Sequence, residues 1–166
     1  MKEIVKIVSV QVEKQIYIPS IKVRGYIDLF VICEINDEKR FYVYDIKTIN
    51  SWSYKMKFGR AAQANPNSQA SIHQELQLGL YGVAIQEEYG RCDGLFLLYY
   101  NKDNSMIKQV DVDLSRIDTA RDFWERTNKR HELGLPFLEE NVAPVMDWEC
   151  RYCSFKSKCD EDHYTK

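Results

Sequence analysis

Residues 24–32 read RGYIDLFVI and residues 41–48 read FYVYDIKT, and these two segments decide the fold. Both are rich in β-branched and aromatic residues, which favour β-strands, and polar turn-forming residues separate them. The two segments therefore predict a β-hairpin. Side chains alternate between the two faces of a strand, so Asp45 and Lys47 share one face, while Asp28 interrupts the apolar partner strand.

Asp28, Asp45 and Lys47 need an explanation, because strands of this composition are usually buried and a buried charge is costly without a compensating partner. The conservative interpretation is a solvated sheet face. The functional interpretation is a metal site, because paired carboxylates are typical protein ligands of Mg²⁺ or Mn²⁺. A lysine on the same face can orient an attacking water or offset negative charge on a phosphate.

The composition is that of one soluble globular domain: 166 residues, of which 45% are hydrophobic and 29% charged. The sequence contains no apolar run of membrane-spanning length and no signal peptide, so we expect a cytoplasmic protein, in the host cytoplasm if a phage encodes it. The formal net charge of −2 is less basic than is usual for a DNA-binding domain. Cations that contact DNA would therefore have to be concentrated locally.

The remaining periodic segments complete an α/β pattern. An alternating strand that ends in Glu13 precedes the hairpin, and an amphipathic helix, two strands and a second helix follow it. The expected ranges are 4–13 for the first strand, 71–88 for the helix, 93–100 and 106–112 for the strands, and 115–133 for the last helix. This order predicts a mixed β-sheet flanked by helices.

The segment 49–70 has neither helical nor strand periodicity and is expected to be a loop. It interleaves aromatic and basic side chains, a pattern that can stack on bases and contact phosphates. These residues are Trp52, Lys55, Lys57 and Arg60. The alternative is a surface loop whose aromatic side chains pack back on the core, and the two interpretations stay open.

The pattern Gly25-x-x-Asp28 followed by Asp45-Ile46-Lys47-Thr48 resembles the PD-(D/E)XK nuclease superfamily. More narrowly, it is similar to the RecB-like branch, which includes CRISPR-associated and phage exonucleases that carry an iron–sulfur cluster. The resemblance implies a restriction-endonuclease-like nuclease core over residues 1–140, with DNA as substrate and Mg²⁺ or Mn²⁺ as cofactor.

The resemblance also assigns roles within that site. Asp28, Asp45 and the carbonyl of Ile46 would hold the metal, and Lys47 would activate the attacking water. Glu13 is a candidate third acid, because related enzymes often carry a carboxylate on the strand before Gly-x-x-Asp. An exposed strand glutamate is the alternative for Glu13.

A second match lies on the predicted helix. Gln77 and Tyr81 are spaced four residues apart, so they share one helix face, and they resemble the Gln-x-x-x-Tyr motif of the RecB-like nucleases. There the two side chains are thought to position the substrate strand beside the metal. Taken alone, such a pair is more often the rim of a helix. His73 lies on the same stripe, and a surface histidine is the simplest interpretation of it.

Three of the five cysteines cluster in the tail, residues 141–166, as Cys150, Cys153 and Cys159. The spacing C-x₂-C-x₅-C favours a metal or cluster site over disulfides. The resemblance implies a [4Fe–4S] cluster whose fourth ligand is a cysteine ahead of the nuclease core. His163 offers a different completion, a Cys₃His set that suits structural Zn²⁺. In either form we expect the site to pin the tail onto the core.

We expect the chain to lack the N-terminal segment in which RecB-like enzymes carry that cysteine and a metal-contacting histidine, so a protein partner is a candidate source of these elements. The function expected is a metal-dependent deoxyribonuclease, of the exonuclease kind, in recombination, repair or the processing of phage or mobile-element DNA. The alternatives are a catalytically impaired DNA-binding accessory module of the same fold and, less favoured, an endonuclease on the same site chemistry.

Overall fold

The computed structural model describes residues 5–60, 72–134 and 152–158. Its regular elements follow the predicted order, but the first three strands are longer than predicted, and a short 3-10 helix and one α-helix are additional. Their bounds are β1 (Val5–Ile18), η1 (Pro19–Ile21), β2 (Val23–Ile35), β3 (Glu38–Ile49), α1 (Ser51–Phe58), α3 (Ile72–Tyr89), β4 (Gly94–Asn101), β5 (Ile107–Val112) and α4 (Ser115–Glu132).

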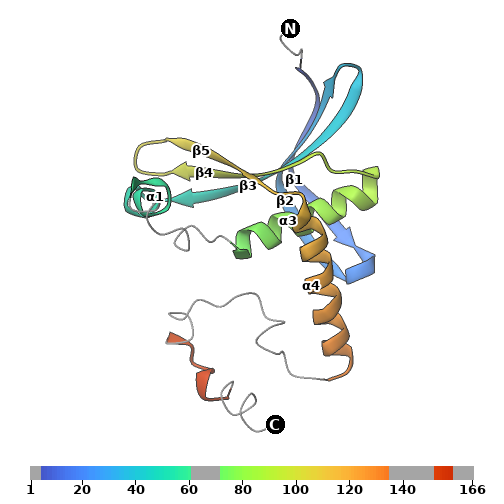
Figure 1. Ribbon diagram of the computed structural model, residues 1–166, viewed down its shortest axis with the longest axis vertical. Helices are drawn as coiled ribbons and strands as arrows, with labels where there is room; N and C mark the ends of the chain where they lie inside the picture. The colour runs from blue at the N-terminus through green and yellow to red at the C-terminus, as the bar shows by residue number, and fades with distance from the viewer. Residues whose placement is uncertain (1–4, 61–71, 135–151, 159–166) are drawn as a thin grey trace. The chain divides into compact units, whose positions relative to one another are not determined.

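The five strands form one mixed sheet in the order β1-β2-β3-β4-β5. All neighbouring pairs are antiparallel except β3 and β4, which are parallel and are connected through α1 and α3 (Figure 1). Parallel neighbours require such a crossover, because the chain must return to the end of the sheet at which the first strand began before it can run in the same direction. The predicted α/β class with a mixed sheet and flanking helices is confirmed.

The predicted hairpin is β2 and β3, joined by a two-residue turn at Asn36 and Asp37. Both residues have positive φ, 52° and 63°. Such turns match the right-handed twist of the strands, and Asn and Asp tolerate the left-handed region better than most residues. Glu38 and Lys39, which lie between the two predicted strand segments, already belong to β3.

The core lies between the sheet and α3. Along β3 the side chains of Val43, Asp45 and Lys47 lie beside Leu95, Leu97 and Tyr99 of β4. Val43 and these three β4 residues are buried, as are most residues of α3 from Leu76 to Ile85. The helix α3 packs against β1, β3 and β4. The alternation therefore aims Asp45 and Lys47 at the face that α3 covers. β4 is fully buried on this face and half-buried on the other.

Two glycines allow α3 to approach the start of α4 closely. A Cβ on Gly79 would lie 2.3 Å from the backbone oxygen of Arg116, and a Cβ on Gly82 would lie 2.7 Å from the side chain of Ile117. Ile117 is 1% exposed. No larger residue fits these positions without a shift of the backbone or of core side chains. The close crossing therefore fixes the rotation of α3 about its axis, and with it the helix face that packs on the sheet.

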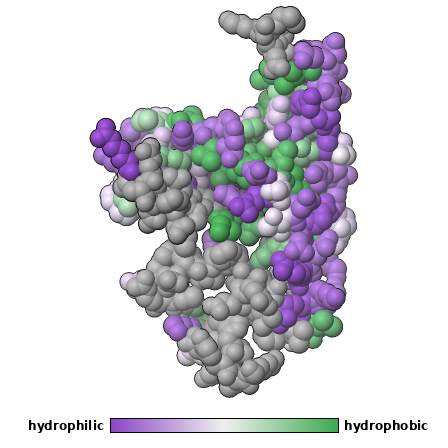
Figure 2. Space-filling model, in the orientation of Figure 1, coloured by the Kyte–Doolittle hydropathy of each residue, from purple (hydrophilic) through white to green (hydrophobic). Residues whose placement is uncertain are grey.

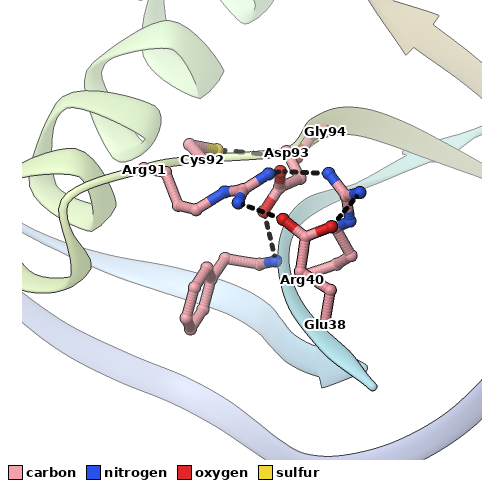
Figure 3. A network of polar contacts seen from close by, with 7 residues as sticks. Glu38, Arg40, Arg91, Cys92, Asp93 and Gly94 are labelled. Carbon is pink, nitrogen blue, oxygen red and sulfur yellow. Dashed lines mark hydrogen bonds and ion pairs between the residues drawn. The ribbon is translucent and has the colours of Figure 1, made fainter. Parts of the chain in front are cut away.

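An ion-pair network ties the loop before β4 to the start of β3 (Figure 3). The carboxylate of Asp93 accepts hydrogen bonds from the backbone N–H of Phe41 at 2.9 Å and from Arg91, and it pairs with Arg40 at 3.3 Å. Glu38 binds both guanidinium groups, at 2.6 and 2.8 Å. The network lies where the parallel ladder of β3 and β4 begins, so it helps to set their register.

Residues 51–58 form the helix α1, so the prediction of a loop throughout 49–70 is wrong for this part. The side chain of Asn50 accepts a hydrogen bond from the N–H of Ser53 at 2.7 Å and caps the helix. Tyr54 and Phe58 pack together, and Phe58 meets Tyr99 edge-on at 5.1 Å. Eight residues are too few to show a clear 3.6-residue period, which is why the sequence pattern did not reveal the helix.

The part of β1 from residue 5 to residue 12 lies in an edge strand and exposes hydrophobic side chains. Ile7 is 64% exposed and Val12 71%, and Figure 2 shows hydrophobic surface at this end of the sheet. A register shift between Ile7 and Ser9 interrupts the pairing with β2, and such bulges discourage edge-to-edge association. No helix of the described ranges has the length and apolar character needed to cross a membrane.

By its internal contacts the chain divides into Met1–Arg121 and Asp122–Lys166. The first unit contains the whole sheet, α1, α3 and the start of α4. In the second unit, Arg126 pairs with Asp122 at 2.9 Å, and the rings of Phe123 and Trp124 meet edge-on. The predicted boundary between a core ending at residue 140 and a tail beginning at 141 lies outside the described residues.

Candidate active site

The candidate site lies where β2 and β3 separate. Their antiparallel ladder ends at the pair Leu29 and Tyr44. Beyond it, β2 stays paired with β1 down to Val23, whereas β3 stays paired with β4 up to Ile49 (Figure 1). Directly after this last pair the two strands separate, and this point of strand separation is termed the notch.

Asp28 and Asp45 are the first residues past the end of the ladder. The Oδ2 atom of Asp28 accepts a hydrogen bond from the backbone N–H of Ile46 at 2.7 Å. This N–H belongs to the part of β3 that has separated from β2. The Asp28 carboxylate therefore replaces the backbone carbonyl that would accept this hydrogen bond in a continuing strand ladder. The bond holds Asp28 close to Asp45, near enough for the Asp28 charge to raise the pKa of Asp45.

Asp45 is a buried carboxylate in an electrostatically strained position. It is 1% exposed, and burial raises its pKa while Lys47 opposes that shift. Its Oδ2 atom lies 2.7 Å from Lys47 Nζ but receives no hydrogen bond of good geometry from any described residue. A buried carboxylate oxygen with unused acceptor capacity, beside a second carboxylate, is suited to a hard divalent cation.

Lys47 connects the two acids to the helix. Its Nζ atom lies between Asp45 Oδ2 and the side-chain oxygen of Gln77, which it reaches at 2.8 Å. The amide nitrogen of Gln77 donates to the Tyr81 hydroxyl at 2.8 Å. Asp45, Lys47, Gln77 and Tyr81 thus form one continuous chain of polar contacts across two elements.

Tyr81 packs over the strand that carries Asp28. Its ring lies 3.5 Å from the position of a Cβ on Gly25, so the glycine of the Gly-x-x-Asp pattern faces the tyrosine. Burial raises the pKa of Tyr81, and the charges of Asp45 and Asp28 raise it further, so the hydroxyl is protonated at neutral pH. Because the hydroxyl oxygen accepts from Gln77, its own proton is available to donate toward the acids or a ligand.

Glu13 is placed near these acids by strand register but does not complete a cluster. Its neighbours Val12 and Lys14 pair with Leu29 and Ile27, the residues that flank Asp28. Glu13 has φ of 50° and an exposed side chain. Within residues 5–60, 72–134 and 152–158, no three His, Cys, Asp or Glu side chains gather as a metal-binding group. The carbonyl of Ile46 and the carboxylate of Glu13 therefore stay predictions as ligands.

The residues predicted to contact DNA divide between two environments. Trp52 is 71% exposed, and Lys55 and Arg60 are also exposed. Lys57 is half-buried, with Nζ 5.0 Å from the centroid of the Tyr99 ring. The helix therefore presents some of these side chains to solvent and directs Lys57 toward the end of β4.

Sequence reasoning missed the surroundings of Lys57. His73, one helical turn before Gln77, is exposed as expected, but it lines a pocket that also contains Lys47, Lys57 and Tyr99. The spacing of His73 and Gln77 was a usable signal for one shared helix face. Tyr99 gave no signal, because only the register of β4 against β3 brings it beside Lys47.

The predicted cysteine site falls almost entirely outside the described residues. Cys150, Cys159 and His163 lie outside the described residues, whereas Cys153 is exposed and forms no disulfide. Cys33 and Cys92 are buried, free cysteines of the first unit. The iron–sulfur or zinc site therefore stays a prediction.

A family model described as the PD-(D/E)XK nuclease superfamily matches residues 2–160. The chain belongs to this superfamily. Its members include hydrolytic nucleases that use divalent metal ions, and the mixed sheet with flanking helices fits their restriction-endonuclease-like fold. That Asp28, Asp45 and Lys47 are the two acids and the lysine of the superfamily's name motif stays a prediction.

Other comparisons add little to this assignment. No curated protein matches the chain. One solved structure, described as "Crystal structure of SSO0001", is similar with 19% sequence identity and a TM-score of 0.47. The match covers 92% of this chain and 61% of that chain. A likeness of this strength carries no argument about function.

Proposed function

We propose that this superfamily member is a divalent-metal-dependent deoxyribonuclease of the RecB-like branch that degrades DNA from its ends. The observation that carries the proposal is the continuous polar chain from Asp45 through Lys47 and Gln77 to Tyr81, with Asp28 beside it. Two motifs far apart in the sequence are adjacent in the notch, which is what a single reaction centre requires.

In this proposal Asp28 and Asp45 hold Mg²⁺ or Mn²⁺, with the Ile46 carbonyl and Glu13 as further ligands. The bound metal would polarise the phosphodiester and lower the pKa of an attacking water. Lys47, fixed between Asp45 and Gln77, orients that water and offsets negative charge that develops on the phosphate oxygens. Tyr81 donates a hydrogen bond to the substrate strand, and the exposed Trp52, Lys55 and Arg60 supply further contacts to DNA.

The tail is proposed to hold a [4Fe–4S] cluster through Cys150, Cys153 and Cys159, with structural Zn²⁺ completed by His163 as the alternative. Its role is structural. Cys153 forms no disulfide, so its thiol is free to act as a ligand. Iron and zinc analysis of anaerobically purified protein distinguishes the two, and a sample with neither metal contradicts both.

The test of the enzyme is cleavage of end-labelled single- and double-stranded DNA in Mg²⁺, in Mn²⁺ and in chelator. Wild type is expected to cleave only with metal, and Lys47→Ala to lose at least about 100-fold in rate, the scale of losing an electrostatic contact to the transition state. Lys39→Ala is the matched control, because Lys39 is an exposed lysine at the far end of the same strand. A ladder of short products from the labelled strand indicates attack from an end.

The accessory-module alternative predicts a different result from the same samples. Wild type and Lys47→Ala would then bind DNA equally well, and neither would change its length in any metal. That outcome, obtained with a fully loaded cysteine site, would overturn the stand-alone enzyme and favour a binding role or a partner that completes the site. A recombination, repair or phage-type pathway belongs to the proposal and requires genetic rather than biochemical tests.

A further inference from the structure

A second feature with binding chemistry lies beside the catalytic notch. A pocket of about 340 Å³ opens at the ends of β3 and β4, between α1 and the start of α3. Lys47, Lys57, His73, Gln74 and Tyr99 contribute to its walls. The metal-binding acids are not part of the lining, so the pocket is adjacent to the predicted metal position rather than identical with it.

The pocket gathers basic side chains from three separate elements. Lys47 comes from β3, Lys57 from α1 and His73 from α3, and none of the lining residues within the described part of the chain is acidic. Glu75, the acid with an influence on Lys57, forms an ion pair with Arg116 at 2.8 Å. Its charge is thus balanced by Arg116. A surface of this kind favours an anion.

Lys57 is held in place rather than extended into solvent. Its Nζ atom lies 5.0 Å from the Tyr99 ring centroid and 5.9 Å from that of Phe58, and its side chain is half-buried. Tyr99 is 2% exposed and its hydroxyl hydrogen-bonds to Gln74, which fixes the wall against which Lys57 rests. Burial lowers the pKa of Lys57, so a nearby anion would recover the electrostatic energy that desolvation costs.

Lys47 joins the pocket to the reaction centre. The same side chain that pairs with Asp45 and Gln77 also forms part of the pocket wall. A ligand in the pocket therefore lies next to whatever group is cleaved at the acids. We propose that the pocket binds a second phosphate of the substrate strand, adjacent to the cleaved one, with Lys57 and His73 as its direct contacts.

This inference rests on the proposed function for the identity of the ligand, and it assigns a positioning role. A strand held at two phosphates is fixed in both place and direction, whereas a strand held at one phosphate can rotate. The phosphate can be an internal one or the terminal phosphate of a strand. Both have the same chemistry, and the experiment separates them.

The first readout needs no cleavage. Binding of labelled single-stranded DNA in chelator is measured between 50 and 200 mM salt for wild type, Lys57→Gln and His73→Gln, with Lys39→Gln as control. The salt slope is the slope of log affinity against log salt concentration, and loss of one phosphate contact reduces its magnitude by about 0.7. Between 50 and 200 mM salt, the factor by which affinity falls should therefore be about 2.6 times smaller for Lys57→Gln than for wild type. A wild-type slope in both pocket variants would overturn the proposal.

The second readout places the phosphate along the strand. Oligonucleotides that carry a single uncharged methylphosphonate linkage at successive positions are cleaved by each protein, with and without a terminal phosphate. A methylphosphonate linkage next to the cleaved bond, or removal of the terminal phosphate, should slow cleavage by wild type severalfold. The same change in the DNA should leave the cleavage rate of Lys57→Gln unaffected. Equal sensitivity of Lys57→Gln and wild type at every position would overturn the proposal.

The two proposals fail in distinguishable ways. If no protein cleaves DNA, the nuclease proposal fails while the salt slope still decides whether the pocket binds phosphate. If wild type cleaves and its slope is unchanged in the variants, only the pocket proposal fails. His73 is exposed, so His73→Gln tests the pocket even if Lys57→Gln disturbs the packing of α1.

Discussion

Replacing Asp45 by Asn should stabilise the protein in chelator and abolish its stabilisation by metal. Asp45 is 1% exposed and burial raises its pKa, so the charged carboxylate is an unfavourable component of the metal-free fold. Relief of such a buried polar penalty is worth about 1–3 kcal/mol. Loss of the ion pair to Lys47, whose side chain is 23% exposed, lowers the free energy of unfolding by up to about 1 kcal/mol and offsets part of this gain.

The net expectation is a gain of about 1 kcal/mol, which corresponds to roughly 3 °C in melting temperature for a chain of this size. Thermal unfolding followed by circular dichroism in chelator measures it. At a free metal concentration 100 times the dissociation constant, wild type should gain about 2.7 kcal/mol. Asp45→Asn should gain little, because it has lost a charged ligand.

The pH dependence gives an independent check on the sign. Because the pKa of Asp45 is raised in the folded state, the folded protein binds the proton more tightly than the unfolded chain does. The penalty is complete above the folded pKa and decreases as the pH falls through it. The advantage of Asp45→Asn should therefore be largest near pH 8 and shrink toward about pH 4, where unfolded Asp also protonates.

The control is Asp111→Asn, which removes an exposed carboxylate from β5 and should change the unfolding free energy by less than about 0.5 kcal/mol. If Asp45→Asn melts below wild type in chelator, the buried charge is not a liability. If metal stabilises Asp45→Asn as much as wild type, Asp45 is not a ligand. Either result refutes the reasoning about this site.

Three further predictions concern the framework around the site. Gly79→Ala should destabilise by about 1–3 kcal/mol in urea unfolding, because its Cβ meets the Arg116 backbone, whereas Gly25→Ala, with its nearest neighbour at 3.5 Å, should cost less than half as much; equal costs would contradict the close helix crossing. The Cys92 thiol, whose pKa burial raises to about 11, should resist a thiol reagent at pH 8 until the protein unfolds, and fast labelling of the native protein would disprove its burial. Asp93→Ala should lower the free energy of unfolding by about 1–3 kcal/mol in the same urea titration, because a backbone N–H of β3 loses its acceptor. An unchanged free energy would show that the network does not help to set the register of β3 and β4.

The sequence by itself determined the local elements of this protein and the identity of its reactive groups. The alternating segments at 24–32 and 41–48 predicted β2 and β3, and the apolar stripe at 71–88 predicted α3, since both periods depend only on local backbone geometry. The same alternation correctly put Asp45 and Lys47 on one face. The motif spacing pointed to the nuclease superfamily that the family match then showed.

Only the tertiary structure decided which of these groups meet. The separation of β2 from β3 beyond the Leu29–Tyr44 pair accompanies the pairing of β3 with β4, a strand some 50 residues later in the chain, and no local pattern contains that information. The helix crossing at Gly79 sets the rotation of α3 and so brings Gln77 to Lys47. The pocket of Lys57, His73 and Tyr99 joins three elements in the same way, because burial and electrostatic contact depend on distance in space and not on distance along the chain.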